Sequence, residues 1–396
     1  MAHAQIDQAL ELLYSGDTAG AEVLLQEAGH GKLEPPAQLP PLDQAAFFEA
    51  LGGIALSKQD GPGAEAAFRR MIALEEQGGA DKSGHATSYA KLAESLLVAD
   101  KHDASLAEFT KALTMKEAAG AAPTTLLNLL YRFADALFRK GKFKDAASHF
   151  DKAIHYAEKS GADFTTLANL AMYHAEALKH YTAPLFGSVR MQKQMQGKSV
   201  PPQVLLLEQQ LEGQYKQAVA LYQKAADLAE KAAMTPEFKL AIARALGELH
   251  SDAGRPVKAV MARKKVIETA EKLKLDTQEL GFMYHGLGES TKAMNQPAEA
   301  AECYRKAIAL KEKAKVDAAS LGKSWYSLGE CLGETKKLEA ALEAFTKARD
   351  LEDNSGATDE NHKMRRKKYW GAVAIVLQAT GKEAEAKEAQ KKADTI

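Results

Sequence analysis

Small and aromatic residues recur at fixed intervals along most of the chain. Several segments carry an alanine, an aromatic residue four positions later and a second alanine three positions after that, as in KGKFKDAASHFDKA (140–153) and EGQYKQAVALYQKA (212–225). We call the residue at the aromatic position the landmark of its repeat, and most landmarks follow one another at steps of 41 residues. The landmarks are Leu25, Phe68, Phe109, Phe150, Tyr222, Arg263, Tyr304, Phe345 and Gln390. Intervals of three and four predict amphipathic helices, and no strand is expected.

A small residue lies sixteen positions before most landmarks. These residues are Gly52, Ala93, Ala134, Gly247, Gly288 and Gly329. Two antiparallel helices approach closely where small side chains meet, and the large landmark side chain then fills the gap between them. In one repeat the long basic side chain of Arg263 replaces the aromatic one. The pattern predicts one helical hairpin per repeat, helix A followed by helix B, with nine hairpins stacked in series.

These positions resemble the signature of the tetratricopeptide repeat (TPR), with an aromatic residue four positions before the small residue of helix A and a leucine directly before it. The first position holds Phe48, Tyr89, Tyr284, Trp325 and Trp370, and the second holds Leu51, Leu92, Leu246, Leu287 and Leu328. The usual repeat has about 34 residues, so a longer helix B is expected, similar to the long repeats of kinesin light chains. The resemblance covers about residues 4–393. It implies an all-α fold: a right-handed TPR superhelix, or α-solenoid, of nine helical hairpins.

One interval between landmarks is longer than the others. From Phe150 to Tyr222 it measures 72 residues, so 31 residues are inserted in the fifth repeat. The expected divisions are an N-terminal array at 1–181 with a Pro-rich loop at 29–43, the insertion at 182–212 and a C-terminal array at 213–396. Two interpretations of the insertion stay open: a surface excursion without regular structure, and a lid or docking strand over the groove.

Composition mainly excludes classes of protein. Because 52 Lys and Arg residues oppose 53 Asp and Glu residues, a nucleic-acid binder with a basic field is not expected. Two cysteines cannot form a disulfide framework in 396 residues, and they suggest a reducing compartment. The first residues do not resemble a signal peptide, and no stretch is apolar enough to cross a membrane. We therefore expect a cytoplasmic protein without membrane insertion.

No catalytic or metal-binding motif stands out. The segments GHGK (29–32) and GGADKSG (78–84) lack the spacing of a phosphate-binding loop. The chain has neither H-E-x-x-H nor C-x-x-C. The sequence therefore predicts no enzyme, no cofactor and no metal ion. A basic run at 363–368 is interpreted as a solvated helix start, with a small anionic docking patch as the alternative.

A carboxylate follows the small residue of helix A in six successive repeats. These acids are Glu94, Asp135, Glu176, Glu248, Glu289 and Glu330. The TPR resemblance places this position on the concave groove lined by helix A, where a stripe of like charge would attract a Lys- or Arg-rich segment. Alternatively, the acids pair within the protein. Arg244 would then pair with Glu248 one turn away, and Lys91, Arg132 and Lys292 would neutralise acids of neighbouring repeats.

Other inward positions of helix A would add hydrogen bonds and aromatic surface to this groove. Asn128 and Asn169 can bond a peptide backbone without selecting a side chain. Tyr131, Tyr173 and Tyr326 offer stacking surface. Each of these residues could instead pack between repeats. Arg132, Arg244 and His285 complete the set of candidate groove residues.

The pattern favours a non-catalytic scaffold or adaptor for protein–protein interaction. It would bind a basic or amphipathic peptide segment or helix in the acidic groove. The alternative is a peptide-sensing regulatory protein whose superhelix changes conformation on ligand binding. Either reading implies a protein or peptide partner and no nucleic acid, and neither predicts an oligomeric state.

Overall fold

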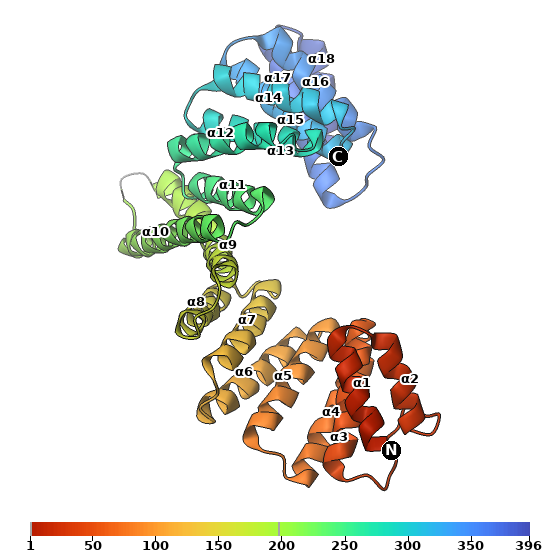
Figure 1. The fold of residues 1–396 in the computed structure, drawn as a ribbon. Coiled ribbons are helices and arrows are strands. Elements are labelled where there is room, and N and C mark those ends of the chain that lie inside the picture. The colour runs from red at the N-terminus through yellow and green to blue at the C-terminus, as the bar shows by residue number, and fades with distance from the viewer. Residues whose placement is uncertain (1, 197–198) are drawn as a thin grey trace. The chain divides into compact units, whose positions relative to one another are not determined.

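A computed structural model describes residues 2–196 and 199–396, including their side chains except those of residues 82 and 83. The described residues form eighteen α-helices and no strand (Figure 1). The helices are α1 (Ala2–Ser15), α2 (Thr18–Ala28), α3 (Pro41–Ser57), α4 (Gly61–Gly78), α5 (Lys82–Val98), α6 (His102–Ala118), α7 (Pro123–Arg139), α8 (Phe143–Lys159), α9 (Phe164–Gln196), α10 (Pro202–Lys231), α11 (Pro236–Asp252), α12 (Pro256–Lys272), α13 (Thr277–Ala293), α14 (Pro297–Lys313), α15 (Ala318–Glu334), α16 (Leu338–Asp353), α17 (Glu360–Ala379) and α18 (Glu383–Thr395). Outside the fifth repeat, each odd-numbered helix packs on the even-numbered helix that follows it, as α3 does on α4 and α13 on α14. These pairs confirm the predicted all-α fold of helical hairpins.

The turn between the two helices of a hairpin has the same backbone geometry in almost every repeat. The residue nine positions before the landmark has a positive φ, at Gly16, Gln59, Asp100, Gly141, Gly254, Asn295, Lys336 and Gly381. Glycine adopts this left-handed conformation without a steric penalty, whereas other residues pay about 1 kcal/mol. The repeats are therefore equivalent at the level of the backbone, even where the turn residue is not glycine.

The landmarks form the core between the helices of each pair. Leu25, Phe68, Phe109, Phe150, Tyr222, Tyr304 and Phe345 are at most 5% exposed. A Cβ atom at Gly52 would lie 2.5 Å from the Phe68 ring, and one at Gly288 would lie 2.8 Å from the Tyr304 ring. The predicted close approach of small residue and landmark is therefore present in these repeats. Gln390 is an exception, since it is exposed and α18 buries alanines instead.

The chain divides into two compact units. Unit 1 consists of residues 1–181 and 223–232, and unit 2 consists of residues 182–222 and 233–396. Each unit has its own apolar core: Leu25 and Phe47 belong to one in unit 1, and Tyr304 and Phe345 to one in unit 2. Helices α9 and α10 each contribute residues to both units.

The inserted segment of the fifth repeat continues the two helices of that repeat. Residues 182–196 extend α9, and residues 202–212 form the first part of α10. Gly213 occupies the register of the turn residue, but it lies inside α10 because the connection has moved to the far end of the insertion. Residues 197 and 198 of the predicted insertion lie outside the described residues.

Apolar packing explains why the insertion is helical. Phe186 and Val189 of α9 are buried, as are Val204 and Leu211 of α10. Each pair follows a helical spacing of three or seven residues, so one apolar stripe lies on each extension. Both a segment without regular structure and a docking strand are therefore wrong for the described part of the insertion.

Candidate binding surfaces on helix A

The acids of the predicted stripe in unit 1 have basic partners within that unit. The ion pairs are Glu94–Arg132, Asp135–Arg139 and Glu176–Lys179. The first joins α5 to α7, the helices A of two successive repeats. Burial raises the pKa of the Glu94 carboxyl group, and the neighbouring Arg132 guanidinium opposes this effect. The net pKa stays raised, so this partner within the same protein offsets only part of the effect of burial.

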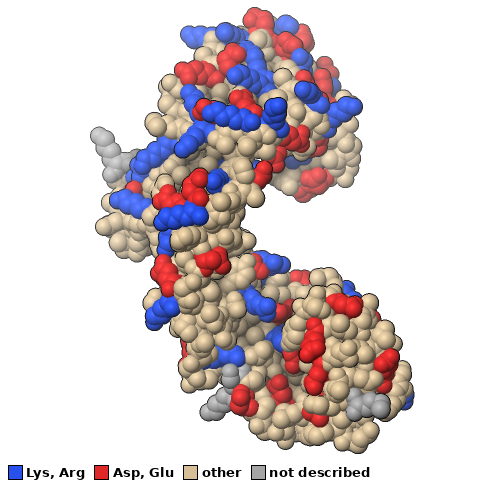
Figure 2. Space-filling view, viewed as in Figure 1, with Lys and Arg blue, Asp and Glu red and all other residues tan. Residues whose placement is uncertain are grey.

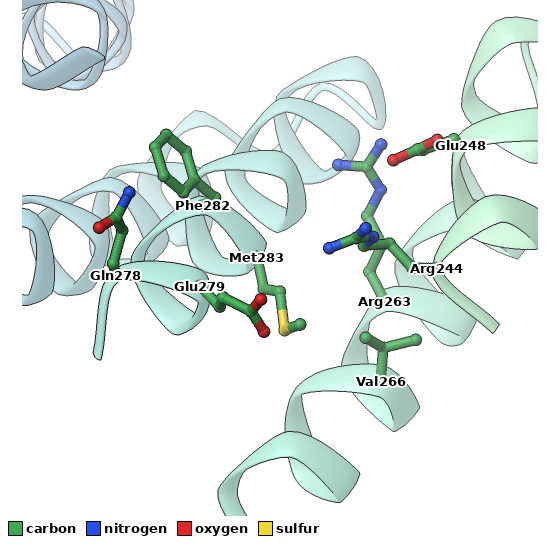
Figure 3. A pocket seen from close by; sticks show the side chains of 8 residues that line it. All are labelled: Arg244, Glu248, Arg263, Val266, Gln278, Glu279, Phe282 and Met283. Carbon is green, nitrogen blue, oxygen red and sulfur yellow. The ribbon is translucent and has the colours of Figure 1, made fainter. Parts of the chain in front are cut away.

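Two acids of the stripe in unit 2 also lie close to basic side chains of that unit. Lys292 Nζ of α13 lies 2.8 Å from Glu330 Oε2 of α15. His285 Nε2 lies 3.5 Å from Glu289 Oε1, and the hydrogen bond to this imidazole lowers the pKa of the Glu289 carboxyl group. Glu248 points toward the side of the pocket that holds two arginines (Figure 3). In Figure 2, the Lys and Arg side chains of unit 2 lie among Asp and Glu side chains rather than in a field of one sign.

Lys91 does not take the role expected for it. Its Nζ contacts the carboxylate of Glu49 on α3 and lies 3.4 Å from the hydroxyl oxygen of Tyr14. Burial alone would lower the pKa of Lys91, but the charge and hydrogen bond of Glu49 more than compensate, and the pKa is raised. The alternative of internal charge pairing thus describes Arg132 and Lys292, while Lys91 pairs with an acid outside the stripe.

Four of the predicted groove residues line one cavity of unit 1. Asn128 and Tyr131 of α7 face Asn169 and Tyr173 of α9 around a space of about 260 Å³. The other lining residues are Leu127, Thr166 and Leu170. The two asparagines occupy the same register, six positions before the small residue of helix A. The structure therefore brings together the hydrogen-bonding and aromatic groups that the sequence placed on consecutive helices A.

The polar side chains of this cavity differ in the partners that they have within the protein. Neither the Asn128 amide nor the Asn169 amide has a hydrogen-bond partner among the described residues. The rings of Tyr131 and Tyr173 lie 5.9 Å apart, and Tyr173 stacks on Phe150 at 5.8 Å. Burial raises the pKa of Tyr131 to about 12, with a smaller contribution from Tyr173. The cavity thus offers two unpaired amides beside a fixed aromatic wall.

The candidates in unit 2 fall into two further cavities. His285, Glu289, Tyr326 and Glu330 line a space of about 630 Å³ between α13, α15 and α17. Arg244 and Glu248 line a separate space of about 380 Å³ between α11, α12 and α13 (Figure 3). The larger cavity also contains Lys292, Lys323, Arg365 and Lys368, so its walls carry both signs of charge.

Sequence reasoning missed Lys323 of the larger cavity and considered Lys368 only as part of the basic run at 363–368. Lys323 and Lys368 stand in the register of Asn128 and Asn169, six positions before the small residue. Comparing this inward position across all repeats would have found them. The same register thus holds an amide in two repeats of unit 1 and an ammonium group in two repeats of unit 2.

A second group of polar residues was missed because it is buried. Lys116 and Glu352 stand seven positions after their landmarks and are at most 7% exposed. Glu352 Oε1 lies 2.8 Å from His362 Nδ1 and 2.7 Å from Arg365 Nη2. Lys311 occupies the same register in the repeat before Glu352. Reading this register across repeats would have shown charged residues where three other repeats have alanine.

The basic run at 363–368 is largely occupied by such contacts. Besides the contact of Arg365 with Glu352, Arg366 Nε lies 2.6 Å from Asp353, and Lys363 lies 2.7 Å from Glu360. The run begins α17, where Asp359 caps the helix by accepting the backbone N–H of His362. The two arginines of this run therefore connect α17 to the end of α16 through ion pairs.

The described residues contain no group of three His, Cys, Asp or Glu side chains that could hold a metal ion. Within the same part of the chain, none of the helices is long and apolar enough to cross a membrane.

Comparison with known proteins supports the repeat assignment. Residues 283–313 and 322–354 match the tetratricopeptide repeat family model. These segments cover most of α13 to α16, which form two adjacent hairpins of unit 2. The TPR resemblance predicted from the repeat pattern is confirmed. No curated protein sequence matches the chain significantly.

Solved structures with a similar fold are repeat proteins of low sequence identity. The apo form of RapI superposes with a TM-score of 0.56 and 11% identity, covering 100% of this chain and 96% of that one. A tetratricopeptide repeat protein from Parabacteroides merdae has a TM-score of 0.44 and 17% identity over 81% of this chain and 98% of its own. Nearly identical TPR-like repeats ascribed to a kinesin light chain of Podosopora anserina have a TM-score of 0.40 and 18% identity, over 54% and 95%. The RapI likeness shows the fold of the chain.

Proposed function

We propose that the protein is a non-catalytic interaction scaffold that binds an extended segment of a partner protein on its helices A. The observation that carries this proposal is the pair of unpaired amides, Asn128 and Asn169, in one cavity of unit 1. A side-chain amide can donate to a backbone carbonyl and accept from a backbone N–H at the same time. Two amides on consecutive repeats can therefore hold a peptide main chain in register.

The aromatic wall of the cavity supplies the affinity that such hydrogen bonds lack. Tyr131 and Tyr173 are 36% and 41% exposed, and both pack against Phe150 on their inner side. Tyrosines held in this way lose little conformational entropy when an apolar side chain covers them, and such residues carry much of the binding energy at interfaces. The proposed ligand is therefore an amphipathic segment with an apolar or aromatic side chain at this position.

The preference for a Lys- or Arg-rich partner, predicted from the acidic stripe, remains a prediction with weaker support. The ion pairs of Glu94, Asp135 and Glu176 reduce the negative potential along helix A. We propose that charge affects mainly the association rate and orientation of the partner. Apolar contacts and the two amides would then determine how long it stays bound.

The test is affinity capture from a lysate of the source cells, followed by direct binding of each captured protein. The variant Asn128→Ala/Asn169→Ala removes both amides from the cavity. Asn361→Ala is the control, because it makes the same chemical change at an exposed position of unit 2. A partner that binds the wild type and the control, and binds the double variant at least about tenfold more weakly, supports the proposal. Equal binding to all three proteins would contradict it.

A further inference from the structure

The core position of the sixth repeat holds an arginine where most other repeats hold a buried ring. Arg263 stands at the landmark, in register with Tyr222 before it and Tyr304 after it. Its guanidinium reaches Gly286 of the next repeat, where an added Cβ would collide with it. The other repeats have larger residues than glycine in the register of Gly286. The sequence thus pairs an unusual core cation with the one small residue that makes room for it.

Arg263 lines a cavity within unit 2. The space of about 380 Å³ lies between α11, α12 and α13. Arg244 and Arg263 form one side of it, and Gln278, Glu279 and Phe282 stand on the opposite side (Figure 3). Val266 and Met283 complete an apolar part of the lining. A volume of this size is at the lower end of the range for small-molecule sites.

The arginines on this wall have unused hydrogen-bonding capacity. Arg263 Nε is buried without a hydrogen-bond partner among the described residues. Arg244 has no ion-pair or hydrogen-bond partner within that part of the chain. Two acids also line the cavity: Glu248, which is partnered, and Glu279, which is exposed. A buried N–H group without an acceptor carries an uncompensated desolvation penalty, and a ligand that accepts its hydrogen bond would remove this penalty.

We propose that this cavity is a binding site for a small organic carboxylic acid. The ligand's carboxylate would accept hydrogen bonds from Arg263 and Arg244, since a guanidinium presents parallel donors that match a carboxylate. Its apolar body would lie against Val266, Phe282 and Met283. An inorganic anion would leave this apolar lining without a partner. The site does not involve Asn128 or Asn169, and it is independent of the proposed peptide site in unit 1.

Arg263 could instead serve packing alone, and one substitution separates the two roles. Arg263→Phe restores the aromatic residue of the repeat pattern. Gly247 faces this position across the hairpin, and a Cβ there would lie 3.2 Å from Arg263 Cγ. Gly288 faces Tyr304 in the same way in the next repeat. The variant is therefore expected to fold while it fills the cavity and removes a cation.

The experiment is isothermal titration calorimetry of the full chain with phenylacetate as the probe. Phenylacetamide has the same body without the charge, and inorganic phosphate has charge without the body. We expect saturable binding of phenylacetate, with each of the other two compounds binding at least about tenfold more weakly. Arg263→Phe and Arg244→Gln should each raise the Kd for phenylacetate at least about tenfold. Because Arg244 is exposed, Arg244→Gln is expected to fold, and it tests the carboxylate site even if Arg263→Phe fails to fold.

Several results would overturn the proposal. The absence of saturable phenylacetate binding up to its solubility limit is one such result, and wild-type affinity of both variants for phenylacetate is another. Equal affinity for phenylacetamide would show that the carboxylate is not recognised. Equal affinity for inorganic phosphate would show that the apolar lining is not used.

Discussion

Lys311 Nζ lies 3.0 Å from Ser324 Oγ, so the ammonium group of one helix B is held by the hydroxyl group of the next helix A. Lys311 is only 2% exposed, and its Nζ also donates to the carbonyl oxygen of Ser320 at 3.1 Å. Ser324 Oγ lies 3.0 Å from His285 Nδ1. Because the serine oxygen accepts from the ammonium group, its own proton is directed to Nδ1, which places the imidazole proton on Nε2, toward Glu289. One buried chain of polar groups thus connects α13, α14 and α15.

The buried position of Lys311 predicts a dependence of stability on pH. Burial lowers the pKa of Lys311 to about 8 in the folded protein, with Asp317 and Glu289 opposing this and Lys323 adding to it. The unfolded chain, with a pKa near 10.5, binds the proton more readily between these values, so stability rises as pH increases from about 8. We expect a gain on the order of 1–3 kcal/mol by the upper end of this range. Urea unfolding at pH 7.5 and pH 9.5 measures most of this gain in stability. Both pH values lie below the range in which tyrosine side chains ionise.

The matched variant for this measurement is Lys311→Met, which keeps a long apolar side chain and removes the titrating group. Its free energy of unfolding should change less between the two pH values than that of the wild type. If the wild type and the variant show the same pH dependence, Lys311 titrates normally in the folded state.

Replacing glycine by alanine should have opposite effects on stability at two positions of α15. A Cβ at Gly329 would lie 2.7 Å from the Phe345 ring, whereas nothing lies within 4 Å of a Cβ at Gly333. Gly329→Ala should therefore destabilise the protein by about 1–3 kcal/mol through overpacking. Gly333→Ala should stabilise it by about 0.5–1 kcal/mol, because alanine has the higher helix propensity. Thermal unfolding of the two variants tests this, and a stable Gly329→Ala variant would show that the hairpins can separate without cost.

The repeat pattern was sufficient to predict the fold because the residues that define it are the residues that pack. Phe68 and Gly52, or Tyr304 and Gly288, are visible in the sequence at a fixed separation, and they touch in the structure. The insertion was harder to predict. It was interpreted as a surface excursion or as a lid or docking strand, but Phe186, Val189, Val204 and Leu211 are buried on two helical extensions. Each extension carries only two of these buried residues, too few to show a helical period in the sequence alone.

Side-chain pairing across repeats was only partly predictable. The sequence suggested Arg132 and Lys292 as partners for acids of neighbouring repeats, but the register alone does not reveal which acid each one meets, such as Glu94 for Arg132. The contact depends on how neighbouring hairpins lie against each other, at a separation of 38 residues in sequence. The four residues of the unit 1 cavity were easier to predict from the sequence. Their places follow from the helical register of two consecutive repeats, with Asn128 and Tyr131 on one helix A and Asn169 and Tyr173 on the next.

Glu330 and Lys292 allow a direct measurement of one such pair. Their charged atoms lie 2.8 Å apart, and the side chains are 33% and 27% exposed. A double-mutant cycle with Glu330→Gln and Lys292→Met should give a coupling energy of about 0.3–1 kcal/mol, in the range of partly exposed ion pairs. The coupling should fall at high salt, because screening weakens partly exposed charges. A coupling energy of zero would mean that Glu330 is effectively a free carboxylate and would strengthen the case for a basic partner.

Glu352 should be far more sensitive to substitution than any acid of the stripe. It is completely buried, and one of its oxygens is shared by His362 Nδ1 and Arg365 Nη2, at 2.8 Å and 2.7 Å. Removing the carboxylate deprives the mostly buried guanidinium of Arg365 of its acceptor and leaves the buried His362 imidazole with Ser355 Oγ, 3.3 Å from Nδ1. Such a loss costs about 3–5 kcal/mol, enough to detach α17 and α18 from the rest of unit 2. We expect Glu352→Ala to lower the unfolding midpoint strongly and to expose the amide protons of α17 to hydrogen exchange.

The control for this prediction is Glu343→Ala, on the same helix α16. Glu343 is exposed and contacts only Lys347, 2.9 Å away on the next turn, so its removal should leave the unfolding midpoint nearly unchanged. Glu352→Gln provides an intermediate, because it keeps an oxygen acceptor for His362 and Arg365 but loses the charge. The expected order of midpoints is Glu343→Ala highest, Glu352→Gln next and Glu352→Ala lowest. If Glu352→Ala is as stable as Glu343→Ala, the buried contacts with His362 and Arg365 do not hold α17 in place, and α17 must be held by the apolar contacts of Tyr369 and Val373 alone.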